Sequence, residues 1–83
     1  MAIEYGLNAI LGEIKETRNK IAVEAKVRPA TIYDMAEGKT KRIELATIES
    51  ILDVINEFAR NVEGLNKTYT IDDLFKYSKK DAE

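Results

Sequence analysis

Apolar residues recur at steps of three and four along most of the chain, which is the spacing that gathers them on one face of an α-helix. The longest run predicts a helix over residues 44–61, with Leu45, Ile48, Ile51, Leu52, Ile55, Phe58 and Ala59 facing inward. A second run predicts a helix over residues 3–14, with Ile3, Leu7, Ile10, Leu11 and Ile14 facing inward. Gly6 and Gly12 interrupt this helix, and each costs about 1 kcal/mol relative to Ala. Close approach of a neighbouring element and simple tolerance both remain open as explanations.

Two short helices are predicted between these long ones. Thr17 is a good N-cap for a helix over 18–25, whose inward residues are Ile21, Ala22 and Ala25. Pro29 suits the first position of a helix over 29–37, whose inward residues are Ile32, Met35 and Ala36. Gly38 is a natural end for that helix, and residues 39–43 form a polar connector.

The pattern breaks over residues 62–70, where "KTYT" at 67–70 weakly favours a short strand. Thr70 followed by Asp73 resembles a capping box that opens a helix over 70–77. The sequence therefore predicts an all-α fold, a bundle of four to five helices around one core. Residues 1–78 form a single domain, and residues 79–83 form a frayed tail.

Composition and charge narrow the class of function. Hydrophobic residues make up 45% and charged residues 34% of the 83 residues, as in a folded globular domain. The net charge is −2, yet residues 15–42 hold eight Lys or Arg against four Asp or Glu. This local excess of positive charge predicts a surface that attracts anions.

The residue inventory argues against catalysis. The sequence contains no His and no Cys, so it offers no catalytic triad, thiol nucleophile, disulfide or thiolate metal site. "GKT" at 38–40 matches the end of a phosphate-binding P-loop, but Tyr33 stands where that motif requires Gly. The chain is predicted not to be an enzyme and to use no metal and no cofactor. It has no apolar run that approaches the roughly 18 residues of a membrane span. Without a signal peptide it is expected in the cytoplasm of a bacterial cell.

The pair of short helices meets the requirements of a helix-turn-helix, whose second helix enters the DNA major groove. Ala22 and Ala25 are small enough for a close helix crossing, and Val27 can plug the turn. The stretch "TRNKIAVEAKVRPATIYDMAEGKTKR" resembles the Cro/CI-type helix-turn-helix of temperate-phage repressors, also called lambda-repressor-like. The family's motif positions are occupied here by Thr17, Ile21, Ala22, Val27, Thr31, Ile32 and Gly38.

The resemblance covers residues 3–77, with the motif over about 17–37. "GKTKR" at 38–42 is similar to a loop that holds the DNA backbone, and "IDDLFKY" at 71–77 is similar to the short helix that closes such domains. Three departures stand out. Lys26 replaces the usual turn Gly, Arg28 and Pro29 replace a Ser cap, and Ala36 stands where Glu or Tyr is common.

The resemblance implies a sequence-specific transcriptional regulator, a repressor of phage or prophage type, that binds a double-stranded DNA operator. Helix 29–37 would enter the major groove and residues 39–42 would hold the phosphate backbone. The DNA-binding residues implied are Thr17, Arg18, Lys20, Arg28, Ala30, Thr31, Tyr33, Asp34, Lys39, Thr40, Lys41 and Arg42. Arg28 would pair with guanine, Ala30 or Thr31 would touch a thymine methyl group, and Asp34 would accept from cytosine.

Several alternatives stay open at this point. The alternative for Arg18 is an ion pair with Glu13 or Asp34. The alternative for Tyr33 is half-buried packing, and the alternative for residues 39–42 is a solvated loop. The apolar C-terminal half either completes the core or forms a homodimer. Asp34, Glu37 and the net charge also fit a protein-binding regulator or anti-repressor of the same fold that does not use DNA. A third hypothesis is that the protein is an antitoxin.

Overall fold

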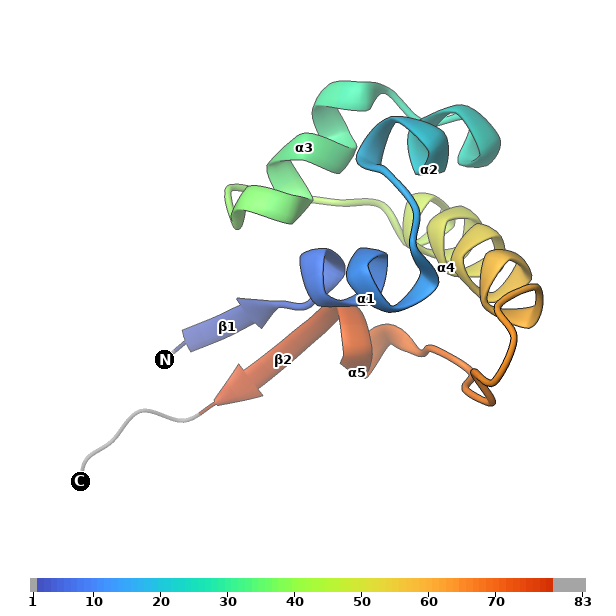
Figure 1. Cartoon of the computed structure of the whole chain (residues 1–83). Helices are drawn as coiled ribbons and strands as arrows, with labels where there is room; N and C mark the ends of the chain where they lie inside the picture. Colours follow the sequence, from blue (N-terminus) through green and yellow to red (C-terminus); the bar gives the residue numbers. More distant parts are fainter. Residues whose placement is uncertain (1, 79–83) are drawn as a thin grey trace.

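The computed structural model describes residues 2–78, and most of them are helical (Figure 1). The elements follow in the order β1 (Ala2–Tyr5), α1 (Leu7–Ile14), α2 (Arg18–Ala25), α3 (Pro29–Glu37), α4 (Leu45–Arg60), α5 (Ile71–Leu74) and β2 (Phe75–Ser78). The prediction of four to five helices is confirmed, with five helices in the described residues. The predicted frayed tail, residues 79–83, lies outside the described residues.

One hydrophobic core joins all five helices of the described chain. The largest fully buried side chains are Leu7, Ile14, Ile21, Ile32, Met35, Ile51, Ile55 and Leu74. The inward faces predicted for α2 and α3 are confirmed residue by residue. Two predicted core positions are wrong: Leu45 is 76% exposed at the first turn of α4, and Ile3 is 49% exposed. Within residues 2–78 no charged side chain is buried, so the polar chemistry lies on the surface.

The fold is not all-α, because the two ends of the described chain form a small sheet. β1 and β2 pair antiparallel, with Ile3 opposite Tyr77 and Tyr5 opposite Phe75. The rings of Tyr5 and Phe75 meet edge to face, with centroids 5.5 Å apart. We call this pair of strands the terminal sheet. The apolar spacing of residues 3–14 suggested one helix, but pairing with a distant strand overrides local helical preference at residues 3–5.

The same pairing shortens the predicted C-terminal helix. The helix predicted over 70–77 extends only from Ile71 to Leu74, because residues 75–78 pair with β1. Its predicted start is confirmed, since the Thr70 N–H donates to Asp73 Oδ2 at 2.9 Å. The strand predicted over 67–70 is wrong, because these residues have no regular secondary structure. Asn56 of α4 instead holds Tyr69 there by accepting from its backbone N–H at 2.7 Å.

The two glycines of the first predicted helix have different explanations. Gly6 lies at the junction of β1 and α1, and its N–H donates to the Leu74 carbonyl at 2.8 Å. A Cβ atom at this position would lie 2.0 Å from the Asp73 carbonyl oxygen. Close approach therefore explains Gly6. A Cβ atom at Gly12 would meet nothing within 4 Å, so Gly12 is merely tolerated.

The turns around α2 and α3 follow the local signals. The Thr17 side chain accepts from the Lys20 N–H at 3.1 Å, which confirms it as an N-cap. Lys26 ends α2 with φ of 59°, a left-handed conformation that costs a non-Gly residue about 1 kcal/mol. Gly38 ends α3 with φ of 75°, where its lack of a Cβ atom avoids that cost. No helix in the described part of the chain is long and apolar enough to cross a membrane.

The glycine contacts give a matched pair of substitutions. Gly6→Ala forces the β1–α1 junction away from Asp73, so we expect it to lower the free energy of unfolding by about 2 kcal/mol or more. Gly12→Ala adds the same methyl group in open space on a helix, so we expect a gain of about 0.5–1 kcal/mol. Urea unfolding followed by circular dichroism measures both. Equal effects of the two substitutions would contradict the close contact at Gly6.

Candidate nucleic-acid interface

Helices α2 and α3 are consecutive, pack against each other and are joined by residues 26–28 only (Figure 1). The Val27 N–H donates to the Ala22 carbonyl at 2.9 Å, which closes the end of α2. The Val27 side chain is half-buried and packs against the core, as expected for a residue that plugs the turn. The short connection therefore fixes the position of α3 against α2.

The side of α3 that turns away from the core, together with Arg28 just before it, carries the residues predicted to face the major groove. Arg28, Ala30, Tyr33 and Asp34 are exposed, whereas Thr31 is half-buried. We call this side the outer face of α3. Arg28 precedes α3, and its side chain makes no capping hydrogen bond, so Pro29 alone favours the helix start. The outer face is thus polar, with one aromatic ring and one carboxylate.

The predicted backbone-binding residues 39–42, here called the basic loop, follow α3 directly. Lys39, Lys41 and Arg42 are exposed. Thr40 differs from the prediction, because its hydroxyl is buried and has no hydrogen-bond partner among the described residues. Arg42 and Thr31 line the same surface hollow, so the end of the loop returns to the outer face of α3.

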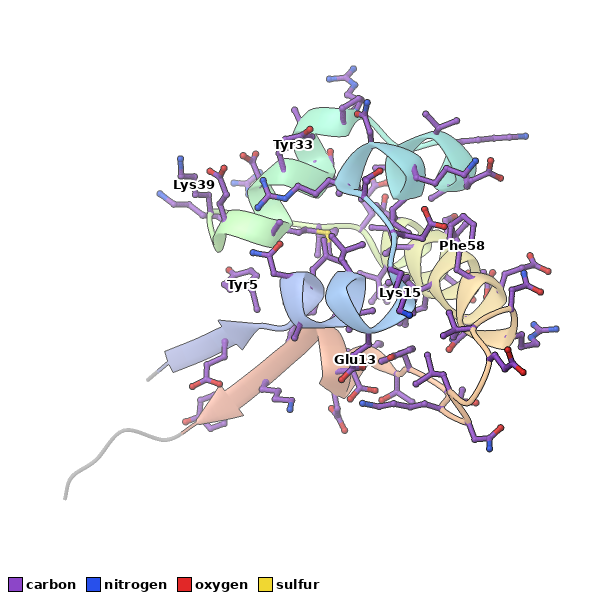
Figure 2. The ribbon with its side chains drawn as sticks, viewed as in Figure 1. Tyr5, Glu13, Lys15, Tyr33, Lys39 and Phe58 are labelled. Atoms are coloured by element: carbon purple, nitrogen blue, oxygen red, sulfur yellow. The ribbon has the colours of Figure 1, made fainter. Side chains whose placement is uncertain are left out.

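The terminal sheet braces this loop, a link that the sequence analysis missed. The Tyr5 hydroxyl of β1 donates to the Thr40 carbonyl at 2.6 Å. A Cβ atom at Gly38 would lie 3.4 Å from the Tyr5 ring, which is an ordinary van der Waals contact, so the ring packs beside the end of α3. Figure 2 shows Tyr5 between the strands and α3, with Lys39 beyond it.

Arg18, at the first position of α2, is held by three groups. Its Nη1 lies 3.6 Å from Glu37 Oε2, and its Nη2 donates to Asn8 Oδ1 at 3.4 Å. Its guanidinium carbon lies 5.1 Å from the centre of the Tyr33 ring. The alternative ion pairs of Arg18 with Glu13 or Asp34 are wrong. Arg18 is therefore positioned beside the outer face by α1 and α3 together.

Asn8 of α1 is the second residue that sequence reasoning missed. Its Nδ2 donates to the Ala36 carbonyl at 3.0 Å while its Oδ1 accepts from Arg18. In the sequence, Asn8 is recognisable only as a polar residue next to the inward Leu7 of α1. Such a signal does not reveal which neighbouring helix the side chain reaches.

Glu37 forms ion pairs with one cation of α2 and one cation of the basic loop. Its Oε1 lies 3.2 Å from Lys39 Nζ, and its Oε2 faces Arg18. The pKa of Glu37 is lowered from its ordinary value of 4.5, first by the hydrogen bond from Lys39 and then by the nearby positive charges. The carboxylate is ionised at neutral pH and neutralises part of the positive charge counted in the sequence.

Lys20 and Thr17 complete the predicted set on α2. Lys20 Nζ lies 3.7 Å from Glu24 Oε2 one turn along the helix, an exposed pair of low energy. Thr17 is exposed, and its oxygen is used in capping. The structure thus brings Arg18 and Lys39 together at Glu37, with the Tyr33 ring against Arg18, whereas Lys20 interacts within its own helix.

The chain matches no protein-family model, no curated protein and no solved structure. The arrangement of its own residues is therefore the basis for any functional proposal.

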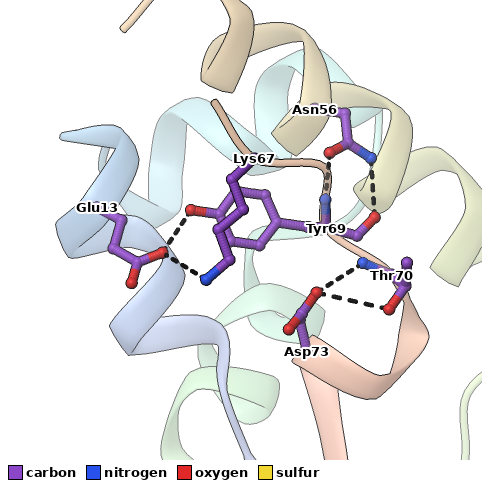
Figure 3. A network of polar contacts seen from close by, with 6 residues as sticks. All are labelled: Glu13, Asn56, Lys67, Tyr69, Thr70 and Asp73. Atoms are coloured by element: carbon purple, nitrogen blue, oxygen red, sulfur yellow. Dashed lines mark hydrogen bonds and ion pairs between the residues drawn. The ribbon is translucent and has the colours of Figure 1, made fainter. Parts of the chain in front are cut away.

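A second polar cluster joins α1, α4 and the segment before α5 (Figure 3). The Tyr69 hydroxyl donates to Glu13 Oε1, and Lys67 Nζ donates to the same oxygen at 3.4 Å. Lys67 Nζ also lies 4.9 Å from the centre of the Tyr69 ring. The Asn56 Nδ2 donates to the Tyr69 carbonyl at 3.1 Å. These contacts tie the segment before α5 to α1 and α4, so a structural role accounts for them.

This cluster shifts two titrations in opposite directions. Burial, followed by the hydrogen bond to Glu13, raises the pKa of Tyr69 from 10.0 to about 12. The same hydrogen bond, assisted by Lys67, lowers the pKa of Glu13 from 4.5. Within residues 2–78 no group of three or more acidic side chains is placed to hold a metal ion.

The Tyr69 shift makes stability depend on alkaline pH. The unfolded chain ionises Tyr69 near its ordinary pKa of 10.0, while the folded chain resists ionisation to about 12. The stabilisation is therefore complete below pH 10 and lost as pH rises from about 10 to 12. We expect the free energy of unfolding to fall less steeply across this range in Tyr69→Phe than in wild type. Urea unfolding at several pH values tests this, and parallel losses in both proteins would contradict it.

Proposed function

We propose that this protein is a sequence-specific DNA-binding regulator of transcription, with α2 and α3 acting as a helix-turn-helix. The observation that supports it most is that cations from two different elements lie beside the outer face of α3, with Arg18 over the Tyr33 ring and Arg42 in the same surface hollow as Thr31. Arg18 and Lys20 lie on α2, and Lys39, Lys41 and Arg42 lie on the basic loop. This arrangement suits a helix that enters the major groove while its neighbours contact phosphates on either side.

Base recognition would come from the outer face of α3. Arg28 can donate two hydrogen bonds to guanine, and the methyl groups of Ala30 or Thr31 can contact a thymine methyl group. Asp34 can only accept, for example from cytosine N4, and it repels phosphate. Tyr33 is 41% exposed and lies under Arg18, so its ring is shared between packing and the groove.

The proposed regulation is repression by occlusion of a promoter, as in regulators of phage or prophage type in bacteria. A homodimer would match a two-fold operator. Ile3 and Tyr77 are paired opposite each other on the terminal sheet, and Tyr77 is 62% exposed. These exposed apolar groups give the terminal sheet a surface against which a second copy can pack.

The first test is the salt dependence of binding to operator DNA obtained by selection from random sequences. Each phosphate contact adds about 0.9 to the slope of log affinity against log salt. Lys41→Ala with Arg42→Ala removes two proposed contacts, so we expect weaker binding to all sequences and a slope smaller by about 1.8.

The matched control removes two exposed cations elsewhere, Arg60→Ala on α4 with Lys76→Ala on β2. It changes the net charge equally but leaves the basic loop intact, so we expect a smaller effect. Equal losses in the two double variants would refute the assignment of the basic loop. Absence of DNA binding by the wild type at low salt would refute the proposed function.

The second test concerns sequence preference. Thr31→Ala keeps a small side chain but alters the methyl and hydroxyl groups of the outer face, so we expect altered preference at one or two base pairs. Each affected base pair should change by about 1–3 kcal/mol in discrimination. Repeating the operator selection with Thr31→Ala and with Lys41→Ala compares a proposed base contact with a proposed phosphate contact. An unchanged preferred sequence for Thr31→Ala would remove Thr31 from base recognition.

One observation favours a second function, a protein-binding regulator or anti-repressor that does not use DNA. Glu37 already pairs with Arg18 and Lys39, and Asp34 is exposed on the same helix. Such a mixed-charge surface also suits a protein partner. A flat DNA titration together with a defined stoichiometric complex with one protein would select this function.

A further inference from the structure

We propose that Glu37 acts as a built-in competitor of phosphate, which lowers the DNA affinity of the surface by occupying Arg18 and Lys39. The inference rests on the proposed DNA-binding function and adds to it a residue that sets affinity. Glu37 is not among the residues expected to contact DNA. Its effect follows from the cations that it engages.

The geometry gives one carboxylate to two cations from different elements. Glu37 Oε2 lies 3.6 Å from Arg18 Nη1 at the start of α2, and Oε1 lies 3.2 Å from Lys39 Nζ at the start of the basic loop. The two cations flank the end of α3. A phosphate that approached either cation would meet the negative charge of Glu37 beside it.

Glu37 is not needed to position Arg18. The Arg18 guanidinium also donates to Asn8 Oδ1 and lies against the Tyr33 ring. These two contacts involve no charge on the partner, so they remain when the carboxylate is removed. Loss of Glu37 should therefore free Arg18 for phosphate without releasing it from the surface.

Glu37 is also not needed to end α3. The helix ends because Gly38 adopts φ of 75°, and the Lys39 N–H donates to the Asp34 carbonyl at 2.8 Å. Both features belong to the backbone. The Glu37 side chain is 45% exposed and makes contact only with the two cations among the hydrogen bonds and ion pairs of the described residues. A substitution of its carboxylate should leave the fold intact.

The energies indicate that Glu37 weakens phosphate binding by Arg18 and Lys39 more than it stabilises the fold. Exposed ion pairs such as these contribute little to stability, so Glu37 does not stabilise the fold through them to a large degree. In contrast, each cation that neutralises a phosphate releases a counterion, which strengthens DNA binding at low salt. An acid placed between two such cations therefore costs more in DNA affinity than it contributes to folding.

The experiment compares Glu37→Gln with Glu57→Gln in the full chain. Glu57 is exposed on α4 and forms no ion pair among the described residues, so its substitution changes the net charge equally away from the surface. The probe is a fluorescent mixed-sequence DNA duplex, followed by anisotropy across a salt series. Circular dichroism confirms that each variant is folded, and Glu37→Ala serves as a second variant.

We expect Glu37→Gln to bind the duplex about three- to tenfold more tightly than wild type at low salt. The salt slope should also steepen, by about 0.9 for each cation that gains a phosphate. Glu57→Gln should change affinity less and leave the slope unchanged.

Equal behaviour of the two glutamine variants, or weaker binding by Glu37→Gln, would overturn the inference while leaving DNA binding in place. Binding by none of the proteins at low salt would overturn the proposed function and, with it, the inference. Binding by Glu37→Gln alone would also overturn the proposed function, because the wild-type chain would not bind DNA, and with it the inference.

Discussion

The approach of two backbone segments at Gly6 is the constraint on which the rest of the structure depends. The Gly6 N–H bonds to the Leu74 carbonyl, and the space where a Cβ atom would lie is filled by the Asp73 carbonyl. This contact places the start of α1 against the end of α5, and the two strands pair immediately beyond it. Because β1 is held there, Tyr5 reaches the carbonyl of Thr40 and braces the basic loop. A glycine far from α3 in sequence thus supports the position of residues at its end.

The surface around α3 combines fixed and free charges. Arg18 is held by Asn8, Tyr33 and Glu37, while Lys41 and Arg42 form no ion pair among the described residues. A count of charges over residues 15–42 treats all of these cations alike. The geometry separates them, because the single negative charge of Glu37 is shared by Arg18 and Lys39. Electrostatic attraction of an anion is therefore expected to be strongest at the far end of the basic loop.

The parts of the fold that could be predicted from sequence are those set by neighbours in the chain. Thr17, Pro29 and Gly38 mark helix ends through their own backbone and side-chain chemistry, and the inward faces of α2 and α3 follow from helical spacing. The terminal sheet could not be predicted in this way. Ile3 fits the apolar spacing of α1, and Phe75 fits a continued helix, so only their pairing partners reveal them as strands. The same holds for the candidate surface. The sequence predicts which residues lie on it, but it does not predict the contacts of Arg18 and Tyr5 with residues on other elements.

The terminal sheet also has a consequence for the order of folding. Its strands join residues 2–5 to residues 75–78, so their pairing closes a loop that contains nearly the whole described chain. The entropy lost on closure grows with loop length, and contacts of such separation form after local ones. Helices α2 and α3, joined by three residues, are expected to pack early, whereas the brace from Tyr5 to the basic loop comes late. The same brace opens first when the ends of the described chain fray, so order in the basic loop depends on the least local pairing in the molecule.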